Sequence, residues 1–251
     1  MTILSRFQAI EEEDKARAVR KLIKDATPDF DFFFMMTLGV LMATFGLLAG
    51  SETVVIGSML IAPILHPVLG LSLGISLSDH RVIRRSLITI GKAGAIAIGA
   101  AIAATFLFSF GTPVESASEI IISRTAPSLL FLVVAIVSGL AVAYTLVKPD
   151  LSETLPGIAV SVALIPPLAV VGIGVAWFDL SMVAGALVMF FVNVVGIVSA
   201  GMLSFSLMNV HAERTVAQQA LVREEKRVAK EEEKVREVDE INHASKPAKS
   251  S

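Results

Sequence analysis

The chain contains no cysteine in 251 residues, which excludes disulfide bonds and thiolate metal sites. Without cysteine, the sequence gives no information on whether the protein works in an oxidising or a reducing compartment. It has only four histidines, and no two of them have the H-x-x-x-H spacing of a zinc-binding helix. One Gly-x-Ser-x-Gly match, at residues 70–74, lies inside a long apolar run and carries little weight as a nucleophile motif. An intramembrane hydrolase would need His66 to meet a serine of another span, and nothing singles out such a serine. These absences argue against an enzyme, a metal site and a bound cofactor.

Charge is scarce in the middle of the chain and concentrated at its two ends. Hydrophobic residues make up 54% of the sequence, and the mean hydropathy is +0.75. This composition is typical of a polytopic membrane protein, whose apolar surface contacts lipids. The net charge of −2 is segregated rather than gathered in a basic patch, so no nucleic-acid partner is expected. The acidic residues 11–14 interrupt the N-terminal region, so we expect the first span to act as an uncleaved signal.

Two long apolar segments are interrupted by proline and glycine. Residues 54–77 contain Pro63 and Pro67, and residues 155–178 contain the pair Pro166-Pro167. Proline lacks a backbone N–H and clashes with the carbonyl four residues earlier, so each segment is predicted to be a broken helix. At a fixed offset of 100, several residues of the first segment and its C-terminal flank match the second: Gly57 and Gly157, Pro67 and Pro167, Gly74 and Gly174, Asp79 and Asp179.

The hydropathy pattern predicts an all-α bundle with six transmembrane spans, arranged as two inverted three-span repeats with broken second spans. The spans are expected at about residues 32–49, 54–77, 87–110, 127–147, 155–178 and 182–208, with a short helix at 113–123. The expected parts of the chain are a cytoplasmic amphipathic head (1–30), the first membrane repeat (31–110), an external connection (111–126), the second membrane repeat (127–209) and a charged, helical cytoplasmic tail (210–251) with a disordered end. Thr27-Pro28 is expected to cap the first span and to begin it.

The basic residues predict the orientation, because cytoplasmic loops of membrane proteins are rich in Lys and Arg. Six basic residues lie in the head, nine in the tail and three in the loop after the second span, whereas Arg124 is alone on the opposite side. We therefore expect a multi-pass inner-membrane protein with both termini in the cytoplasm. If both broken segments were re-entrant hairpins, only four crossings would remain and the basic loops would fall on both sides.

Paired, interrupted segments at corresponding positions of two repeats point to a transporter-like binding site near the middle of the membrane. The alternative is that the prolines only kink two packed helices. Neither segment contains an acidic residue, so a small anion, a neutral or zwitterionic solute, or a monovalent ion fits better than a divalent cation. The candidate pathway residues are Gly57, Pro63, His66, Pro67, Gly157, Pro166, Pro167 and Asn193.

Three polar residues have two interpretations each. His66 is an ionisable group within a span, so it either binds a solute or proton or hydrogen-bonds a carbonyl that a proline has freed. Asn193 either bridges helices or lines the site beside Pro166-Pro167. Arg124 either attracts anions at an external entrance or caps the fourth span.

The tail is polar nearly all round, with nine basic and nine acidic side chains in residues 211–251. The spacing of Leu221, Val228 and Val235 does not form a strict heptad seam, because Glu224 and Glu231 fall between them. The pattern predicts a solvated cytoplasmic helix that extends the sixth span.

The motifs V-I-G-S-M-L-I-A-P-I-L-H-P-V-L-G, S-R-T-A-P, A-L-I-P-P-L-A and F-F-V-N-V-V-G closely resemble the membrane-protein family known as domain of unknown function 389. The resemblance covers residues 31–205 and implies a multi-pass prokaryotic membrane protein, but no substrate. The family-typical residues carried over by position are Gly57, Pro63, Pro67, Arg124, Pro127, Gly157, Pro166, Pro167 and Asn193. The family pattern has a small residue where this chain has His66, which argues against a histidine mechanism shared by the family.

The leading interpretation is a small-solute or ion transporter or channel, acting as a homo-oligomer, with its site between the two proline breaks. The rival is a non-transporting membrane scaffold or regulator that acts through its cytoplasmic tail, in which case the breaks are packing features.

Overall fold

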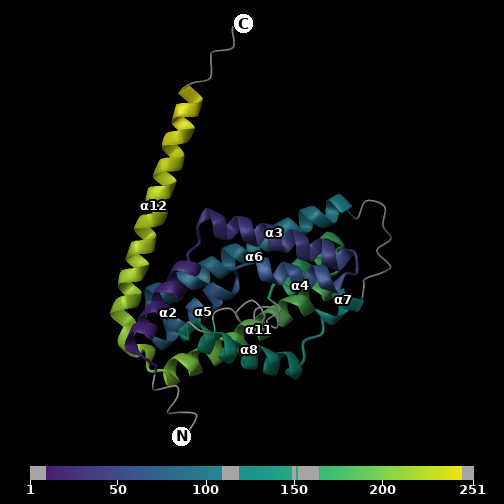
Figure 1. The fold of residues 1–251 in the computed structure, drawn as a ribbon. Helices are drawn as coiled ribbons and strands as arrows, with labels where there is room; N and C mark the ends of the chain where they lie inside the picture. Colours follow the sequence, from purple (N-terminus) through teal and green to yellow (C-terminus); the bar gives the residue numbers. More distant parts are fainter. Residues whose placement is uncertain (1–9, 109–118, 149–150, 152–163, 245–251) are drawn as a thin grey trace.

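A computed structural model describes residues 10–108, 119–148, 151 and 164–244 of the chain. In these residues every regular element is a helix (Figure 1). Helices α3 to α11 lie alongside one another in a bundle, and α12 projects away from one end of it. The elements are α2 (Glu12–Asp25), α3 (Phe30–Leu48), α4 (Glu52–Ile61), α5 (Leu65–Ser76), α6 (His80–Phe108), α7 (Glu119–Ser123), α8 (Leu129–Val147), α10 (Ile165–Ala176), α11 (Leu180–Leu207), η2 (Val210–Glu213) and α12 (Arg214–Ala244).

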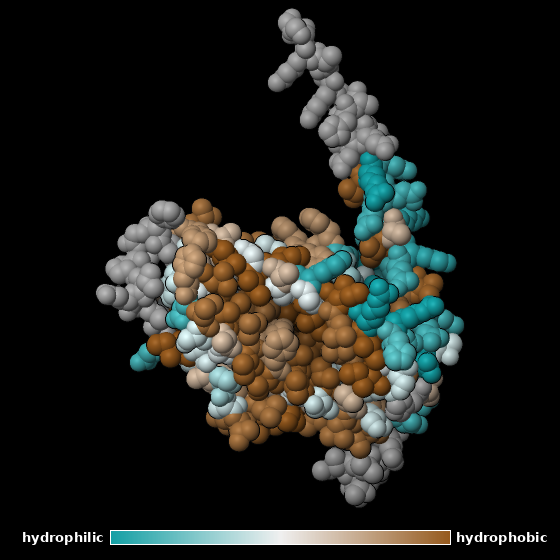
Figure 2. All heavy atoms as spheres, turned by 180° about the vertical axis from the view of Figure 1, so that it is seen from behind, coloured by the Kyte–Doolittle hydropathy of each residue, from teal (hydrophilic) through white to brown (hydrophobic). Residues whose placement is uncertain are grey.

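Four of the described helices are long and apolar enough to cross a membrane: α3, α6, α8 and α11. Helices α4 and α5 together meet the same criterion, but they are bent by 51° at their junction. Helix α10 is a shorter apolar helix, and residues 152–163 of the predicted fifth span lie outside the described residues. The chain is therefore an all-α, multi-pass membrane protein, and apolar side chains cover much of the bundle surface in Figure 2.

The prolines mark where helices begin. Pro63 lies in the short break between α4 and α5, as the sequence predicts. Pro67, however, is the third residue of α5, and Pro166 and Pro167 lie in the first turn of α10. The missing N–H has no effect in a first turn, where those groups lack an intrahelical partner in any case.

The same turn ends α5 and α10, and a similar turn at Gly50 (φ 67°) ends α3, where the Ser51 N–H donates to the Gly46 carbonyl over 2.8 Å. After α5, Ser78 adopts φ 51° and the Asp79 N–H donates to the Gly74 carbonyl over 2.9 Å. After α10, Phe178 adopts φ 59° and the Asp179 N–H donates to the Gly174 carbonyl over 2.8 Å. This is the Schellman arrangement of a helix C-terminus. Each aspartate then caps the next helix, as Asp79 Oδ1 accepts from Val82 N and Asp179 Oδ1 accepts from Met182 N.

Small residues allow the helices to approach closely. A Cβ placed on Gly39 would lie 2.7 Å from the Ala62 Cβ, and one on Gly139 would lie 2.8 Å from the Ala200 Cβ. The two glycines occupy equivalent positions in α3 and α8, but they contact different partners, the end of α4 and the middle of α11.

The structure corrects two sequence predictions at the ends of the bundle. Helix α3 begins at Phe30 and is capped by Asp29, whose side chain accepts from the Phe32 N–H over 2.9 Å, so the predicted cap at Thr27-Pro28 is wrong. The tail does not extend the last span as one helix, because the left-handed Asn209 (φ 55°) and η2 separate α11 from α12. Helix α12 instead packs against α2, with Ala217 and Leu221 buried.

The contact between α10 and α6 supports a matched test of packing. A Cβ on Gly172 would lie 2.9 Å from the Ile98 carbonyl oxygen of α6 and still closer to Ala101, whereas a Cβ on Gly94 would meet only Leu168 Cδ2, at 4.0 Å. We expect Gly172→Ala to destabilise the protein by about 1–3 kcal/mol, because backbone cannot move aside as a side chain can. Gly94→Ala should be neutral or slightly stabilising. Thermal unfolding followed by size-exclusion chromatography measures both, and equal melting temperatures would contradict the packing argument.

Candidate functional site

The break between α4 and α5 consists of Ala62, Pro63 and Ile64. Two backbone bonds hold it: the Ala62 N–H donates to Ser58 O over 3.3 Å, and the His66 N–H donates to Pro63 O over 3.2 Å. Helices α3, α8 and α10 surround the break inside the bundle, and α2 covers it from the end where α12 begins. The broken backbone is thus enclosed by protein, as lipid requires.

An apolar cavity of about 250 Å³ lies against the break, and we call it the inner cavity. Its wall comes from the end of α4, the break, the start of α5, α8 and the start of α10. The inner cavity therefore lies between the first proline break and the segment that leads into Pro166-Pro167, where the sequence predicts a site. Its lining residues are Met59, Leu60, Ile61, Ala62, Pro63, Ile64, Leu65, His66, Leu69, Val142, Leu146, Leu164 and Ile165.

A second cavity of about 390 Å³, which we call the vestibule, lies on the other side of the break. It is polar and combines α2, the α2–α3 linker, the start of α3 and one side chain of α12. Its lining residues are Lys24, Asp25, Thr27, Asp29, Asp31, Phe32, Met35, Ile61, Pro63, His66 and Arg227. Because Ile61, Pro63 and His66 line both cavities, they form the wall that separates the vestibule from the inner cavity.

His66 connects the bundle to the head of the chain. Its Nε2 lies 3.8 Å from Asp25 Oδ2, and both side chains are about one third exposed. Its other ring nitrogen, Nδ1, is buried and has no hydrogen-bond partner among the described residues. The sequence singles out His66 but not Asp25, which comes from a different helix. Three closely spaced aspartates, Asp25, Asp29 and Asp31, directly after a basic run are the signal that could have indicated an acidic vestibule.

Of the candidate residues that the structure describes, only Pro63 and His66 line either cavity. Pro67, Pro166 and Pro167 are buried in first turns, and none of them lines the inner cavity. A Cβ on Gly57 would lie 2.9 Å from Met42 Cε, so Gly57 serves the contact of α4 with α3.

Gly157 lies outside the described residues. Asn193 is buried on α11, interacts with its surroundings and lines neither cavity.

Arg124 lies between α7 and α8, away from the vestibule. Burial lowers the pKa of its guanidinium, and the nearby Glu52 carboxylate opposes this change. Its Nε is buried without a hydrogen-bond partner among the described residues. The structure thus brings Arg124 near Glu52, at the start of α4, and not near His66.

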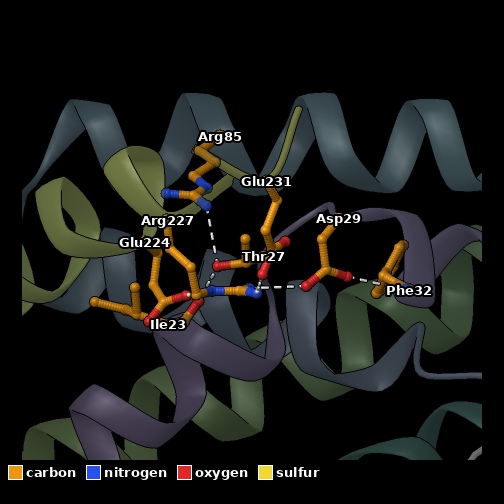
Figure 3. Close-up of polar contacts among 8 residues, drawn as sticks. All are labelled: Ile23, Thr27, Asp29, Phe32, Arg85, Glu224, Arg227 and Glu231. Carbon is orange, nitrogen blue, oxygen red and sulfur yellow. Dashed lines mark hydrogen bonds and ion pairs between the residues drawn. The ribbon is translucent and has the colours of Figure 1, made fainter. Parts of the chain in front are cut away.

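The tail contacts the head through Arg227, as Figure 3 shows. Its Nη2 donates to Asp29 Oδ2 over 2.8 Å, while its other nitrogens donate to Glu224 and Glu231 of its own helix over 2.7 and 2.9 Å. The hydrogen bonds to Asp29 and Glu224 raise the pKa of the Arg227 guanidinium. Beside it, Arg85 of α6 donates to Thr27 Oγ1 over 2.9 Å. The α2–α3 linker is therefore held between α6 and α12.

A second contact joins the tail to the turn before α6. The Gln218 amide donates to Asp79 Oδ2 over 2.8 Å, and Arg214 donates to the Ser78 carbonyl over 3.4 Å. Burial raises the pKa of the Asp79 carboxyl, but the hydrogen bonds from Gln218, Val82 and Arg81 outweigh burial, and the pKa is lowered. Asp79 thus stabilises the docked tail at pH values above its ordinary pKa, and this contribution is lost as the pH falls through the lowered pKa.

We expect Gln218→Ala to raise the pKa of Asp79, because it removes the largest lowering interaction. Acid should then release the tail at a higher pH than in the wild type. Since the chain has no cysteine, a nitroxide on Val222→Cys, which is 40% exposed, reports the mobility of α12 during acid titration. The neighbouring exposed Gln219→Ala serves as the control. Identical midpoints in the two variants would contradict the assignment.

The comparisons with known proteins agree with the resemblance seen in the motifs. The sequence pattern of one family, described as a domain of unknown function (DUF389), matches residues 59–199. An uncharacterized protein of Methanocaldococcus jannaschii, MJ0678, is 28% identical over 212 residues, which cover 80% of this chain and 64% of that protein. The chain thus spans less than two thirds of this relative's length. No solved structure matches. Because the family pattern covers more than half of the chain, the chain belongs to the DUF389 family.

Proposed function

We propose that the protein is a small-solute or ion transporter or channel of the inner membrane, without enzymatic activity, whose pathway passes the α4–α5 break. The observation that carries this proposal is the pair of cavities. Among the described residues, the polar vestibule and the apolar inner cavity share three lining residues: Ile61, Pro63 and His66. A helix end leaves its last carbonyls without intrahelical partners, so the end of α4 offers polar groups at this wall. A small movement of the wall would join the two cavities.

An inverted repeat of two three-span halves is part of the proposal. Helices α5 and α10 begin and end 100 residues apart, and the same turn follows each of them. Asp79 in the first turn contacts the tail, near the end of α11. Asp179 in the second turn begins α11, a helix of 28 residues and about 42 Å. The two turns therefore lie at opposite ends of the bundle, which supports inversion.

The contact between Asp79 and Gln218 of the tail also supports six full crossings with both termini in the cytoplasm. The turn before α6 lies beside the tail, because Asp79 binds Gln218. Re-entrant second and fifth spans would place these two segments on opposite sides of the membrane. Arg124 and Glu52 meet away from that end, as loops on the external side would.

Single cysteines distinguish the two topologies, since the chain has none of its own. We expect Arg81→Cys and Val235→Cys to react with an impermeant maleimide only from the cytoplasmic side, and Ile122→Cys only from outside. All three positions are exposed in the structure. Re-entrant spans predict the reverse for Arg81 and Ile122, while Val235 stays cytoplasmic. That reversed pattern would disprove the six-span arrangement.

Filling the inner cavity tests the transport function. Leu60 lines the cavity but is 52% exposed, so a larger side chain has room there without disturbing the core. We expect Leu60→Trp to remove most of the flux in proteoliposomes, measured with a panel of anions, amino acids and monovalent cations, because it narrows the pathway. The control is Leu130→Trp on α8, which is 69% exposed and lines neither cavity. Equal flux through both variants would contradict a pathway at the break.

A homo-oligomer also belongs to the proposal. One face of α6 carries small exposed residues at every fourth position: Gly91, Ala95, Gly99 and Ala103. A Cβ on Gly91 or Gly99 would meet nothing within 4 Å. Helices in membranes approach one another closely along such faces.

A scaffold or regulator acting through the tail is the second candidate function. The observation in its favour is that α12 extends beyond its contacts with the head, with Val235 and Val238 more than half exposed. Deletion of residues 232–251 removes this extension and keeps Arg227. A deletion that abolishes cellular activity but leaves flux intact would favour the scaffold.

A further inference from the structure

The vestibule carries more negative than positive charge. Three of its lining side chains are aspartates, Asp25, Asp29 and Asp31, and one fixed cation of the head, Lys24, lies with them. Without the tail, the vestibule is thus left with two carboxylates in excess. A cavity lined by charge of one sign concentrates ions of the opposite sign.

The chain itself places a cation in this vestibule. The Arg227 guanidinium reaches Asp29 from a position 198 residues later and lines the cavity. Asp29 is well fixed, because its other oxygen accepts from the Phe32 N–H. The Arg227 and Asp29 side chains are 34% and 19% exposed, so this ion pair is open to solvent and to exchange.

His66 has one ring nitrogen that lacks a hydrogen-bond donor among the described residues. Its Nε2 faces the Asp25 carboxylate, which favours the tautomer with the proton on Nε2 and leaves Nδ1 as an acceptor. Nδ1 is buried and has no hydrogen-bond partner in the part of the chain that the structure describes. A buried acceptor without a donor costs free energy. In the described residues, no group of three or more side chains could hold a metal ion.

The inner cavity indicates the chemical character of the rest of the solute, beyond its positively charged group. Apart from His66, its lining side chains are apolar, and it begins at the same wall where the vestibule ends. An inorganic cation would find no carboxylate or hydroxyl ligand among these side chains, whereas the apolar part of an organic cation would be favourably buried there.

We propose that the vestibule binds a small organic cation with an ammonium or guanidinium head, and that Arg227 of the tail occupies this site as a built-in competitor. This inference rests on the proposed function, since it names the class of solute for the same pathway. The cationic head contacts Asp25 and Asp29, and the apolar part lies against Pro63 and the inner cavity. Displacing Arg227 frees this part of α12 from Asp29, so solute binding and the Arg227–Asp29 ion pair exclude each other.

Equilibrium binding of radiolabelled methylguanidinium to the full chain in nanodiscs tests the proposal at constant ionic strength. We expect saturable binding that butylamine displaces and that butyrate and butanol do not. Arg227→Ala should bind about fivefold tighter, since a competing exposed ion pair is removed. Arg227→Lys keeps the competitor and should behave as the wild type. The control is Arg223→Ala, an exposed basic residue of the same helix that does not line the vestibule.

Asp25→Asn and Asp29→Asn should each weaken binding, and Asn at position 29 retains the capping function for α3. The absence of saturable methylguanidinium binding, displacement by butyrate, or equal affinity in Arg227→Ala and Arg223→Ala would each overturn the proposal. Binding without flux of any solute would leave the cation site standing and remove the transport function. Flux of an anion or a neutral solute without methylguanidinium binding would remove the cation site and leave the transport function standing.

Discussion

The structure depends on one constraint, which is that a broken helix in a membrane must be covered by protein. Pro63 interrupts the second apolar segment, and the exposed backbone needs partners or an enclosed space. Helices α3, α8 and α10 enclose the break inside the bundle, and α2 closes it at one end. Small residues such as Gly39, which contacts Ala62 directly before Pro63, allow the helices to come close enough to do so. The cavities at the break are what this enclosure leaves unfilled.

Electrostatics decides how the two ends of the chain meet over that enclosure. Asp29 caps α3 directly after the α2–α3 linker, and α12 brings a guanidinium to its carboxylate, so segments almost 200 residues apart form one surface. Arg227 is held in place by Glu224 and Glu231 of its own helix, which keep its side chain extended toward Asp29. The charged ends are therefore part of the site and not separate appendages.

The sequence predicts the parts of this arrangement that are local. Hydropathy locates α3, α6, α8 and α11 to within a few residues at most ends, although α6 begins seven residues before the predicted span. Proline correctly predicts the break at Pro63, but Pro67 and Pro166 begin helices, because proline disrupts only a helix interior. The sequence predicts that Thr27 caps α3, but Asp29 caps the helix instead, because its carboxylate accepts from the Phe32 N–H. Contacts between distant segments, such as Asp25 with His66, leave no periodic signal and could not be predicted.

The turns after α5 and α10 have the same framework but different surroundings. Gly74 with Asp79, and Gly174 with Asp179, end one helix and cap the next with the same hydrogen bonds. The surroundings of the two turns differ, because the first lies against the tail and the second does not. The end where the first turn lies therefore carries the charges of the head and the tail, which the end with the second turn lacks. In the proposed transporter, an electric field would act on a solute before it reaches the apolar cavity, so this asymmetry would determine which solutes enter from the end where head and tail meet.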